Sequence, residues 1–264
     1  MAEPVAAPIL AVEGLQKRFG GLTALGGIDL AVGKGEVIGI IGANGAGKTT
    51  FVNIVTGYLK PSDGRITVNG IDVTGLPPRV MTRRGICRSF QMSQLFASLT
   101  CLENLVLAHA AAENGGWKLL ADPWTADRLA RAEEGLARFG IADYRDARTA
   151  TLPQGVRKLL DVVLAVAARP HLLLLDEPTS GIASDQRFQI MDVIMGQMAE
   201  CGVTVLFVEH DMDLVERYAR RVLAFLDGRI AADGSVAEVF GHDEVRRAIV
   251  GDHRATRRPM GPGQ

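Results

Sequence analysis

The sequence predicts an α/β fold whose core is a parallel β-sheet. Four short apolar runs, rich in Val, Ile and Leu, occupy residues 37–41, 171–176, 203–208 and 221–226. Runs that are apolar at consecutive positions are typical of strands buried on both faces, as the strands of parallel sheets are. Residues 185–200, between two of these runs, have the helical character expected of a crossover that joins parallel strands.

A glycine-rich segment follows the first of these runs and sharpens the prediction. Residues 42–49 read GANGAGKT, and residues 49–57 have a helical pattern. Gly-x-x-x-x-Gly-Lys-Thr between a strand and a helix is the pattern of a phosphate-binding loop. Its glycines allow the backbone to wrap closely, so that successive N–H groups and the helix N-terminus face phosphate oxygens. The segment therefore predicts a P-loop NTPase fold with a nucleotide site.

Two side chains of this loop carry most of its chemistry. Lys48 is expected to reach the β- and γ-phosphates of a nucleoside triphosphate, and the Thr49 hydroxyl is expected to bind Mg²⁺. The predicted nucleotide-binding residues of the loop are Gly42, Ala43, Asn44, Gly45, Ala46, Gly47, Lys48, Thr49 and Thr50.

A pair of carboxylates ends the second apolar run, where residues 172–178 read LLLLDEP. Asp176, at the carboxyl end of this strand, is placed to join the Mg²⁺ shell. Glu177 is expected to point elsewhere and to orient or deprotonate a water. The alternative, that Glu177 is only a solvated acid at a strand end, is less favoured next to a complete phosphate-binding loop.

Two regions lack the pattern of the parallel core. Residues 62–74 alternate between polar and apolar positions and predict a turn with short strands. Residues 100–150 contain several helical patterns and no convincing strand; one of them, at 126–140, ends in Gly140, a suitable helix C-cap. We therefore expect a small β part and a helical part beside the core.

Composition limits the classes of function. The 264 residues carry a formal net charge of −1, so bulk charge indicates neither nucleic acid nor an anionic membrane as partner. No apolar run approaches the roughly 18 residues that span a bilayer, and residues 1–14 lack the features of a signal peptide. Cys87, Cys101 and Cys201 lie far apart, without metal-site or disulfide spacing. A reduced, cytosolic compartment fits best.

Taken together, these motifs resemble the ATP-binding subunits of ABC transporters over about residues 9–250. Gln91, in RSFQ, stands where that family has a glutamine that contacts Mg²⁺ or water and senses the membrane subunits. His210, in VEHDM, stands at the switch histidine that touches the γ-phosphate. Phe19, in KRFGG, matches the aromatic residue that stacks on adenine, although a Phe in a strand is often a core residue instead.

A closer resemblance is to the ATPases of branched-chain amino-acid importers. It is carried by GLPP…RRGICRSFQMSQLFASLTCLENL, by VEHDMDLVERYARRV and by the helical insertion around Trp117 and Trp124. Those two tryptophans are expected to pack within the helical subdomain rather than to bind a ligand. The resemblance implies a nucleotide-binding lobe, an antiparallel β subdomain and a helical subdomain at about 95–160. It thus predicts one ABC ATP-binding domain at 1–251, followed by a flexible basic tail at 252–264.

The same resemblance implies cofactors, partners and a location. ATP and Mg²⁺ are the expected cofactors, with Thr49, Gln91 and Asp176 near the metal. The expected partners are a second ATPase subunit, two transmembrane permeases and, indirectly, a periplasmic solute-binding protein, with no nucleic acid. The chain would then be peripheral on the cytoplasmic face of the inner membrane.

The segment LPQGV at 152–156 departs from the family pattern. It aligns with the signature Leu-Ser-Gly-Gly-Gln, which caps the nucleotide held by the other subunit of a head-to-tail dimer. Leu152 and Gly155 match, and Gln154 stands at a variable place, but Pro153 removes a hydroxyl and a backbone N–H and Val156 removes another polar group. Ala183 is a second departure, where the family usually has Asp or Asn. This degenerate signature predicts a heterodimer, unless Gln154 or Arg157 restores the phosphate contacts.

The sequence therefore favours the ATP-hydrolysing subunit of an importer, with Glu177, His210 and Gln91 as catalytic residues. The solute would be a branched-chain or other hydrophobic amino acid, or a related small carboxylate or amide. The main alternative is a soluble ABC-type ATPase of nucleic-acid or ribosome metabolism, but no tandem domain, long coiled-coil insertion or basic face supports it. A non-hydrolysing nucleotide-gated protein and a small-molecule kinase fit less well with the ordered set of Gln91, Glu177 and His210.

Overall fold

The computed structural model describes residues 7–89, 95–114 and 122–250. The predictions for Gln91, for Trp117 and for the tail at 252–264 fall outside these ranges. In the described part of the chain, no helix combines the length and apolar character needed to cross a membrane.

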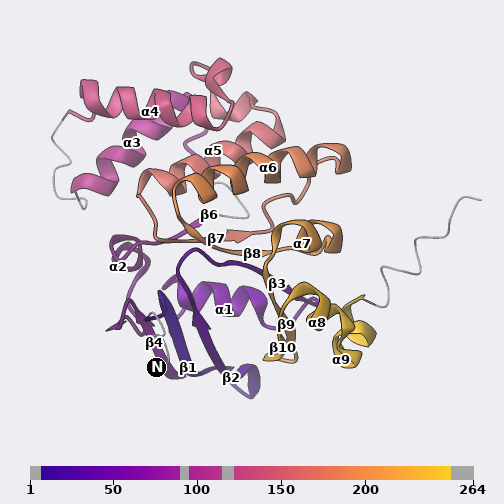
Figure 1. The fold of residues 1–264 in the computed structure, drawn as a ribbon. Helices are drawn as coiled ribbons and strands as arrows, with labels where there is room; N and C mark the ends of the chain where they lie inside the picture. Colours follow the sequence, from indigo (N-terminus) through magenta and orange to yellow (C-terminus); the bar gives the residue numbers. More distant parts are fainter. Residues whose placement is uncertain (1–6, 90–94, 115–121, 251–264) are drawn as a thin grey trace, which may run out of the picture.

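The central sheet has the strand order β10-β9-β3-β8-β7-β6 within the described residues (Figure 1). The neighbouring strands β9, β3, β8, β7 and β6 pair in parallel, and β10 pairs antiparallel with β9. Four of these strands confirm the predicted runs to within one residue at either end. The strands are β3 (Val37–Gly42), β6 (Ile86–Ser89), β7 (Leu172–Asp176), β8 (Thr204–Val208), β9 (Arg221–Leu226) and β10 (Arg229–Gly234).

An antiparallel sheet with the order β2-β1-β4-β5 lies beside this core. It confirms the short strands predicted at 62–74. Its two longest strands were not predicted, because the buried side chains of β1 alternate irregularly through several register shifts and β2 is interrupted by two glycines. The strands are β1 (Leu10–Phe19), β2 (Leu22–Val32), β4 (Asp63–Val68) and β5 (Ile71–Asp72).

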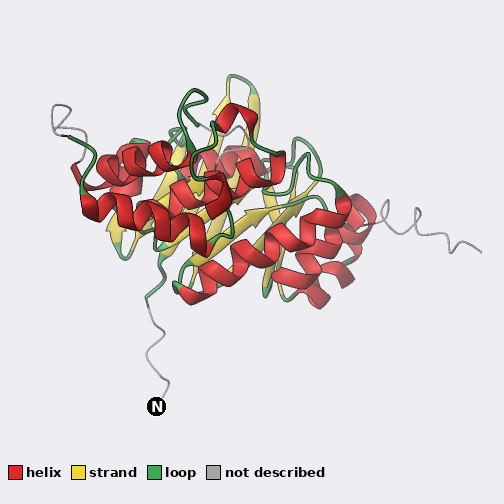
Figure 2. Ribbon diagram, turned by 90° about the horizontal axis from the view of Figure 1, so that it is seen from above, coloured by secondary structure: helices red, strands yellow, loops and turns green. Residues whose placement is uncertain are grey.

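Helices cover both faces of the central sheet, as Figures 1 and 2 show. The helix α1, which follows the glycine-rich segment, lies on the face toward the antiparallel sheet, and α6 lies on the opposite face, which confirms the predicted crossover helix. These and the shorter helices are α1 (Lys48–Val55), α2 (Pro78–Arg83), α6 (Ser184–Glu200), α7 (Met212–Tyr218), α8 (Val236–Gly241) and α9 (Asp243–Val245), with a π-helix at Arg246–Val250.

The helical part consists of α3 (Cys101–Asn114), α4 (Ala126–Arg138) and α5 (Gln154–Ala167), with short 3₁₀ turns at Ala142–Tyr144 and Thr149–Thr151. The side chain of Thr125 caps the start of α4. Gly140, with φ of 68°, follows the end of this helix, as the sequence predicts. Trp124 is 47% exposed, so the packing expected of this tryptophan involves only part of its ring.

The two faces of the central sheet belong to two separate hydrophobic clusters. Leu173 and Leu175 of β7 face the cluster formed with α3 to α7, whereas Leu172 and Leu174 face the cluster formed with α1 and the antiparallel sheet. This alternation fixes the register of the strands, because a slip of one residue would move every side chain to the other face. It also fixes which loops meet at the carboxyl edge, where β3, β7 and β8 end.

Candidate active site

Residues 42–47 link the end of β3 to the start of α1, and two glycines of this loop cannot be replaced without strain. Gly42 has φ of 154°, and a Cβ there would lie 2.5 Å from the Phe225 carbonyl oxygen. Gly47 has φ of 101°, and a Cβ there would lie 2.8 Å from the Ala24 carbonyl oxygen. The loop therefore packs closely against the backbones of β9 and β2, and it leads into the N-terminus of α1, whose N–H groups can bind an anion.

The ammonium group of Lys48 lies inside this loop. It donates hydrogen bonds to the carbonyl oxygens of Gly42, at 2.5 Å, and of Ala43, at 3.0 Å, and the residue is only 6% exposed. Burial lowers the pKa of Lys48, while the nearby carboxylates of Glu177 and Asp176 partly offset this shift. A buried ammonium group held by neutral carbonyl groups is a favourable partner for a phosphate group.

The adjacent carboxylates of the second motif differ in their surroundings. Asp176 ends β7 with its side chain only 3% exposed, whereas the side chain of Glu177 is 24% exposed. Glu177 has φ of 49°, a conformation that non-glycine residues rarely adopt and that is concentrated at functional sites. Its N–H donates to the Val208 carbonyl oxygen at 3.0 Å, and Lys158 of α5 donates to its carbonyl oxygen at 3.3 Å. The backbone of Glu177 is thus held from both sides.

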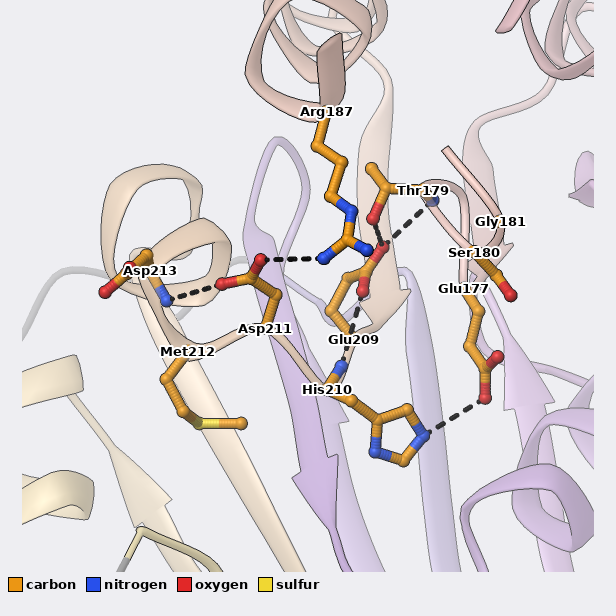
Figure 3. A pocket seen from close by; sticks show the side chains of 10 residues that line it. All are labelled: Glu177, Thr179, Ser180, Gly181, Arg187, Glu209, His210, Asp211, Met212 and Asp213. Carbon is orange, nitrogen blue, oxygen red and sulfur yellow. Dashed lines mark hydrogen bonds and ion pairs between the residues drawn. The ribbon is translucent and has the colours of Figure 1, made fainter. Parts of the chain in front are cut away.

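Glu177 and His210, which lie on different loops, contact each other directly. The Oε1 atom of Glu177 lies 3.1 Å from Nε2 of His210 (Figure 3). This brings together the carboxylate and the histidine that the sequence selects from separate motifs. A carboxylate beside a histidine can take up a proton from water while the histidine orients neighbouring groups, which suits hydrolysis.

Glu209 supports this pair, and the sequence analysis did not identify it. It is only 4% exposed, and its carboxylate accepts hydrogen bonds from the Thr179 hydroxyl, at 2.7 Å, and from the N–H groups of Thr179 and His210, at 3.0 and 3.3 Å (Figure 3). Burial raises the pKa of Glu209, and the Thr179 hydrogen bonds oppose the shift. Its position directly before His210 in VEHDM was the available signal. Glu209 fixes the loop after β8 against the loop after β7.

A cavity of about 550 Å³ opens beside these residues, and Figure 3 shows its lining. On its far side, the Arg187 guanidinium donates to the Asp211 carboxylate at 3.3 Å. The lining residues are Glu177, Thr179, Ser180, Gly181, Arg187, Glu209, His210, Asp211, Met212 and Asp213. The cavity gives a water molecule access to Glu177 and His210.

The donors around the loop fit a magnesium–nucleotide complex. Thr49 is exposed at the start of α1 and offers a hydroxyl, and Asp176 offers a carboxylate, which are the oxygen ligands that Mg²⁺ prefers. Asp176 forms an ion pair with the guanidinium of Arg88 in this structure, a contact that the sequence analysis missed. Ala43, Asn44 and Gly45 are also exposed, whereas the Ala46 side chain is buried in the hydrophobic cluster around α1.

Phe19 lies at the end of β1 and is 48% exposed, so the alternative role as a core residue is wrong. The Lys17 ammonium lies 5.0 Å from the centroid of its ring. An aromatic ring that is this exposed can stack on a nucleobase.

Replacing Phe19 by Ala is expected to weaken ATP binding about tenfold, because base–aromatic stacking contributes roughly 1–3 kcal/mol. The dissociation constant can be measured by fluorescence with a labelled ATP analogue. Ile71→Ala is the matched control, since Ile71 is a similarly exposed apolar residue on β5, at 46%. Equal affinity for the Phe19 variant and the wild type would remove Phe19 from the site.

The segment 152–156 forms the start of α5, with Pro153 as the N-cap and Gln154 as the first helical residue. The first turn of a helix leaves backbone N–H groups without helical acceptors, so this end keeps some ability to bind an anion. The two side chains that could compensate for the altered sequence have local partners. Arg157 donates to the carbonyl oxygens of Thr149 and Ala150, at 3.2 and 3.1 Å, and Gln154 donates to that of Ser180 at 3.5 Å.

Val156 and Ala183, which depart from the family pattern, each have a structural position that shows what the side chain contributes. Val156 is half-buried and packs against the hydrophobic cluster of the helical part, so its side chain contributes to packing. Ala183 is the N-cap of α6 and provides no side-chain acceptor there, whereas Asp or Asn at this position could cap the helix.

Comparisons with known proteins agree with this geometry. Residues 25–180 match the family described as ABC transporter. The chain is 34% identical to the high-affinity branched-chain amino acid transport ATP-binding protein LivG of Salmonella typhimurium, over 93% of this chain and 98% of the relative. It is 33% identical to the corresponding protein BraF of Pseudomonas aeruginosa, with the same coverage of both chains.

Solved structures of ATP-binding cassettes are also similar to this chain. An ATP-binding cassette of an ABC transporter in its ADP conformation superposes with a TM-score of 0.82 at 30% identity, covering 92% of this chain and 98% of that one. A dimeric cassette in a post-hydrolysis state, bound to ADP and Pi, gives a TM-score of 0.73 at 25% identity, covering 86% and 98%. The chain therefore belongs to the ABC transporter family, as an ATP-binding subunit that hydrolyses ATP to drive transport.

Proposed function

We propose that this ATPase powers an importer of branched-chain or other hydrophobic amino acids, or of a related small carboxylate or amide. The contact between Glu177 and His210 beside the phosphate-binding loop carries the catalytic part of the proposal. The solute class is supported by the names of the relatives LivG and BraF, at 33–34% identity. Residues that select the solute would belong to other subunits.

Within this proposal, each side chain has one role. Lys48 binds the β- and γ-phosphates, and Phe19 stacks on adenine. Thr49 and Asp176 would hold Mg²⁺, which neutralises charge on the phosphates when bound. Glu177 accepts a proton from the attacking water, and His210, held by Glu209, contacts the γ-phosphate. Gln91, outside the described residues, is proposed to contact the metal or water and to respond to the membrane subunits.

The partners we propose are a second ATPase subunit, two permeases and, through them, a periplasmic binding protein. A groove of about 260 Å³ between β6, α3 and α5 is suited to a permease segment, because it is lined mainly by apolar side chains and Phe96 at its edge is 60% exposed. Binding there would place the chain as a peripheral protein on the cytoplasmic face of the inner membrane.

Affinity purification of the tagged chain from solubilised membranes tests the assembly. We expect two permease subunits to co-purify in a fixed ratio to the chain. Phe96→Asp should reduce their recovery, while Ile71→Asp, which places the same charge on β5, should not. Recovery of ribosomes or nucleic acid in place of permeases would contradict the proposal and favour the soluble ATPase.

Replacing Lys48 by Ala should weaken ATP binding itself rather than the chemical step. The ammonium group is the buried cation of the loop, and hydrogen bonds to charged groups contribute about 1.5–3 kcal/mol. We expect the dissociation constant for ATP to rise by roughly 10–100-fold, in line with that range. Equilibrium binding of labelled ATP measures it, and unchanged affinity would contradict the assigned role of the loop.

A further inference from the structure

Arg88 connects three elements at the carboxyl edge of the sheet. Its guanidinium forms an ion pair with Asp176 at the end of β7, and Nη1 donates to Oδ1 of Asn53 on α1 at 2.5 Å. The Arg88 and Asp176 side chains are only 9% and 3% exposed. Arg88 itself lies on β6, two residues before the segment 90–94 that contains Gln91. The contact is thus a buried ion pair that involves the carboxylate assigned to Mg²⁺.

A buried carboxylate needs compensating charge, and besides the nearby ammonium group of Lys48 two cations can bind Asp176 directly. In this structure the Arg88 guanidinium binds the Asp176 carboxylate, and in the metal-loaded site Mg²⁺ would bind it. A guanidinium and a divalent cation at one carboxylate repel each other strongly where water is scarce. Arg88 therefore competes with the metal for Asp176, and without the metal it holds this side chain in place.

Arg88 also lines the groove between β6, α3 and α5 that we assign to a permease segment. The same groove contains Phe96, Asn104 and Asp161, so one side chain borders both the docking groove and the metal carboxylate. A segment that enters the groove changes the surroundings of Arg88 directly, without any movement of the sheet.

We propose that Arg88 is a positioning residue that makes metal affinity depend on occupation of this groove. With the groove empty, the guanidinium holds Asp176 and lowers its affinity for the metal. When the groove is filled, the guanidinium shifts from Asp176 and the metal binds more tightly. The second half of this inference rests on the proposed function, whereas the first half concerns the isolated chain alone.

The first test uses Mn²⁺ as a spectroscopic probe of the metal site. Mn²⁺ is titrated by electron paramagnetic resonance into the full chain with ATP, on a Glu177→Gln background. Arg88→Met and Arg88→Gln, which both remove the competing charge, are expected to bind Mn²⁺ about tenfold more tightly. ATP affinity in the presence of a chelator should stay within about twofold of wild type, and Arg88→Lys, which keeps the charge, should restore the weaker Mn²⁺ binding.

Arg221→Met is the matched control, because Arg221 also bridges two side chains, here the carboxylates of Glu36 and Asp233, but away from Asp176. It should leave Mn²⁺ binding unchanged. A purely structural role for Arg88 would loosen the site and weaken the binding of both metal and nucleotide. Unchanged or weaker Mn²⁺ binding in both neutral Arg88 variants overturns the proposal.

The second test measures the Mg²⁺ concentration for half-maximal ATPase activity, with and without the permeases. Assembly is expected to lower this concentration about tenfold for wild type and to leave it unchanged for Arg88→Gln, in which the competition is already absent. An equal shift in both proteins overturns the coupling. If no permeases assemble with the chain, the coupling falls with the proposed function, while the Mn²⁺ titration still decides whether Arg88 competes for Asp176.

Discussion

Replacing Glu177 by Gln is expected to abolish most ATP turnover while ATP binding is retained. Loss of a general base typically costs about 10²–10⁴-fold in rate, and we expect a decrease in that range. Glu177 faces the cavity and contacts His210, whereas its neighbour Asp176 is buried in an ion pair. The substitution keeps the size of the side chain and removes its capacity to accept a proton.

ATP turnover is measured as phosphate release by the assembled transporter, and ATP affinity is measured by binding of labelled ATP. Asp213→Asn is a suitable control, because Asp213 lines the same cavity from α7 and the substitution removes one carboxylate while Glu177 and His210 are both retained. The control should retain the wild-type rate. An unchanged rate for Glu177→Gln would show that another group activates the water.

A partner ATPase subunit with an intact signature should raise the ATPase rate of this chain by about 10²–10³-fold, the contribution of one preorganised donor. In a homodimer, both phosphate loops would face the start of α5, where Pro153 offers neither a hydroxyl nor an N–H group. Gln154 and Arg157 bond to carbonyl groups nearby, so they are engaged locally. We therefore propose a heterodimer in which the site built by Lys48 and Glu177 of this chain is the faster one.

The chain can be assayed alone and with its partner, and Glu177→Gln in this chain should remove most of the gain. A complementary variant, Pro153→Ser combined with Val156→Gln, restores the family residues and should raise the activity of the isolated chain. Full activity from the unaltered isolated chain, with two nucleotides occluded symmetrically, would contradict the heterodimer.

The parallel core could be predicted because its signal is local. Strands such as β7 and β8 are buried on both faces, so each appears in the sequence as an unbroken apolar run. The four residues of β6 are too few to give such a signal, and β10 has mostly half-exposed residues. The place of β6 in the sheet depends on parallel pairing with β7, which is distant in sequence. The place of β10 depends on antiparallel pairing with β9.

The motif residues of the site could be selected from the sequence for the same reason. Asp176 ends a recognisable strand and Lys48 and Glu177 follow one, and parallel strands bring their carboxyl ends to one edge. The ion pair of Arg88 with Asp176 and the hydrogen bond of Lys158 to Glu177 could not be predicted. They join side chains whose contacts depend on the packing of β6 and α5 against β7, and no local pattern marks them.

ATP-dependent uptake into proteoliposomes tests the central claim most directly, that hydrolysis at Glu177 of this chain drives import. The vesicles would carry the permeases and both ATPase subunits, with MgATP inside and with the binding protein and radiolabelled leucine outside. We predict leucine accumulation together with phosphate release, and loss of both when Glu177 is replaced by Gln. Leucine accumulation that continues at the wild-type rate in the Glu177→Gln vesicles would contradict the account.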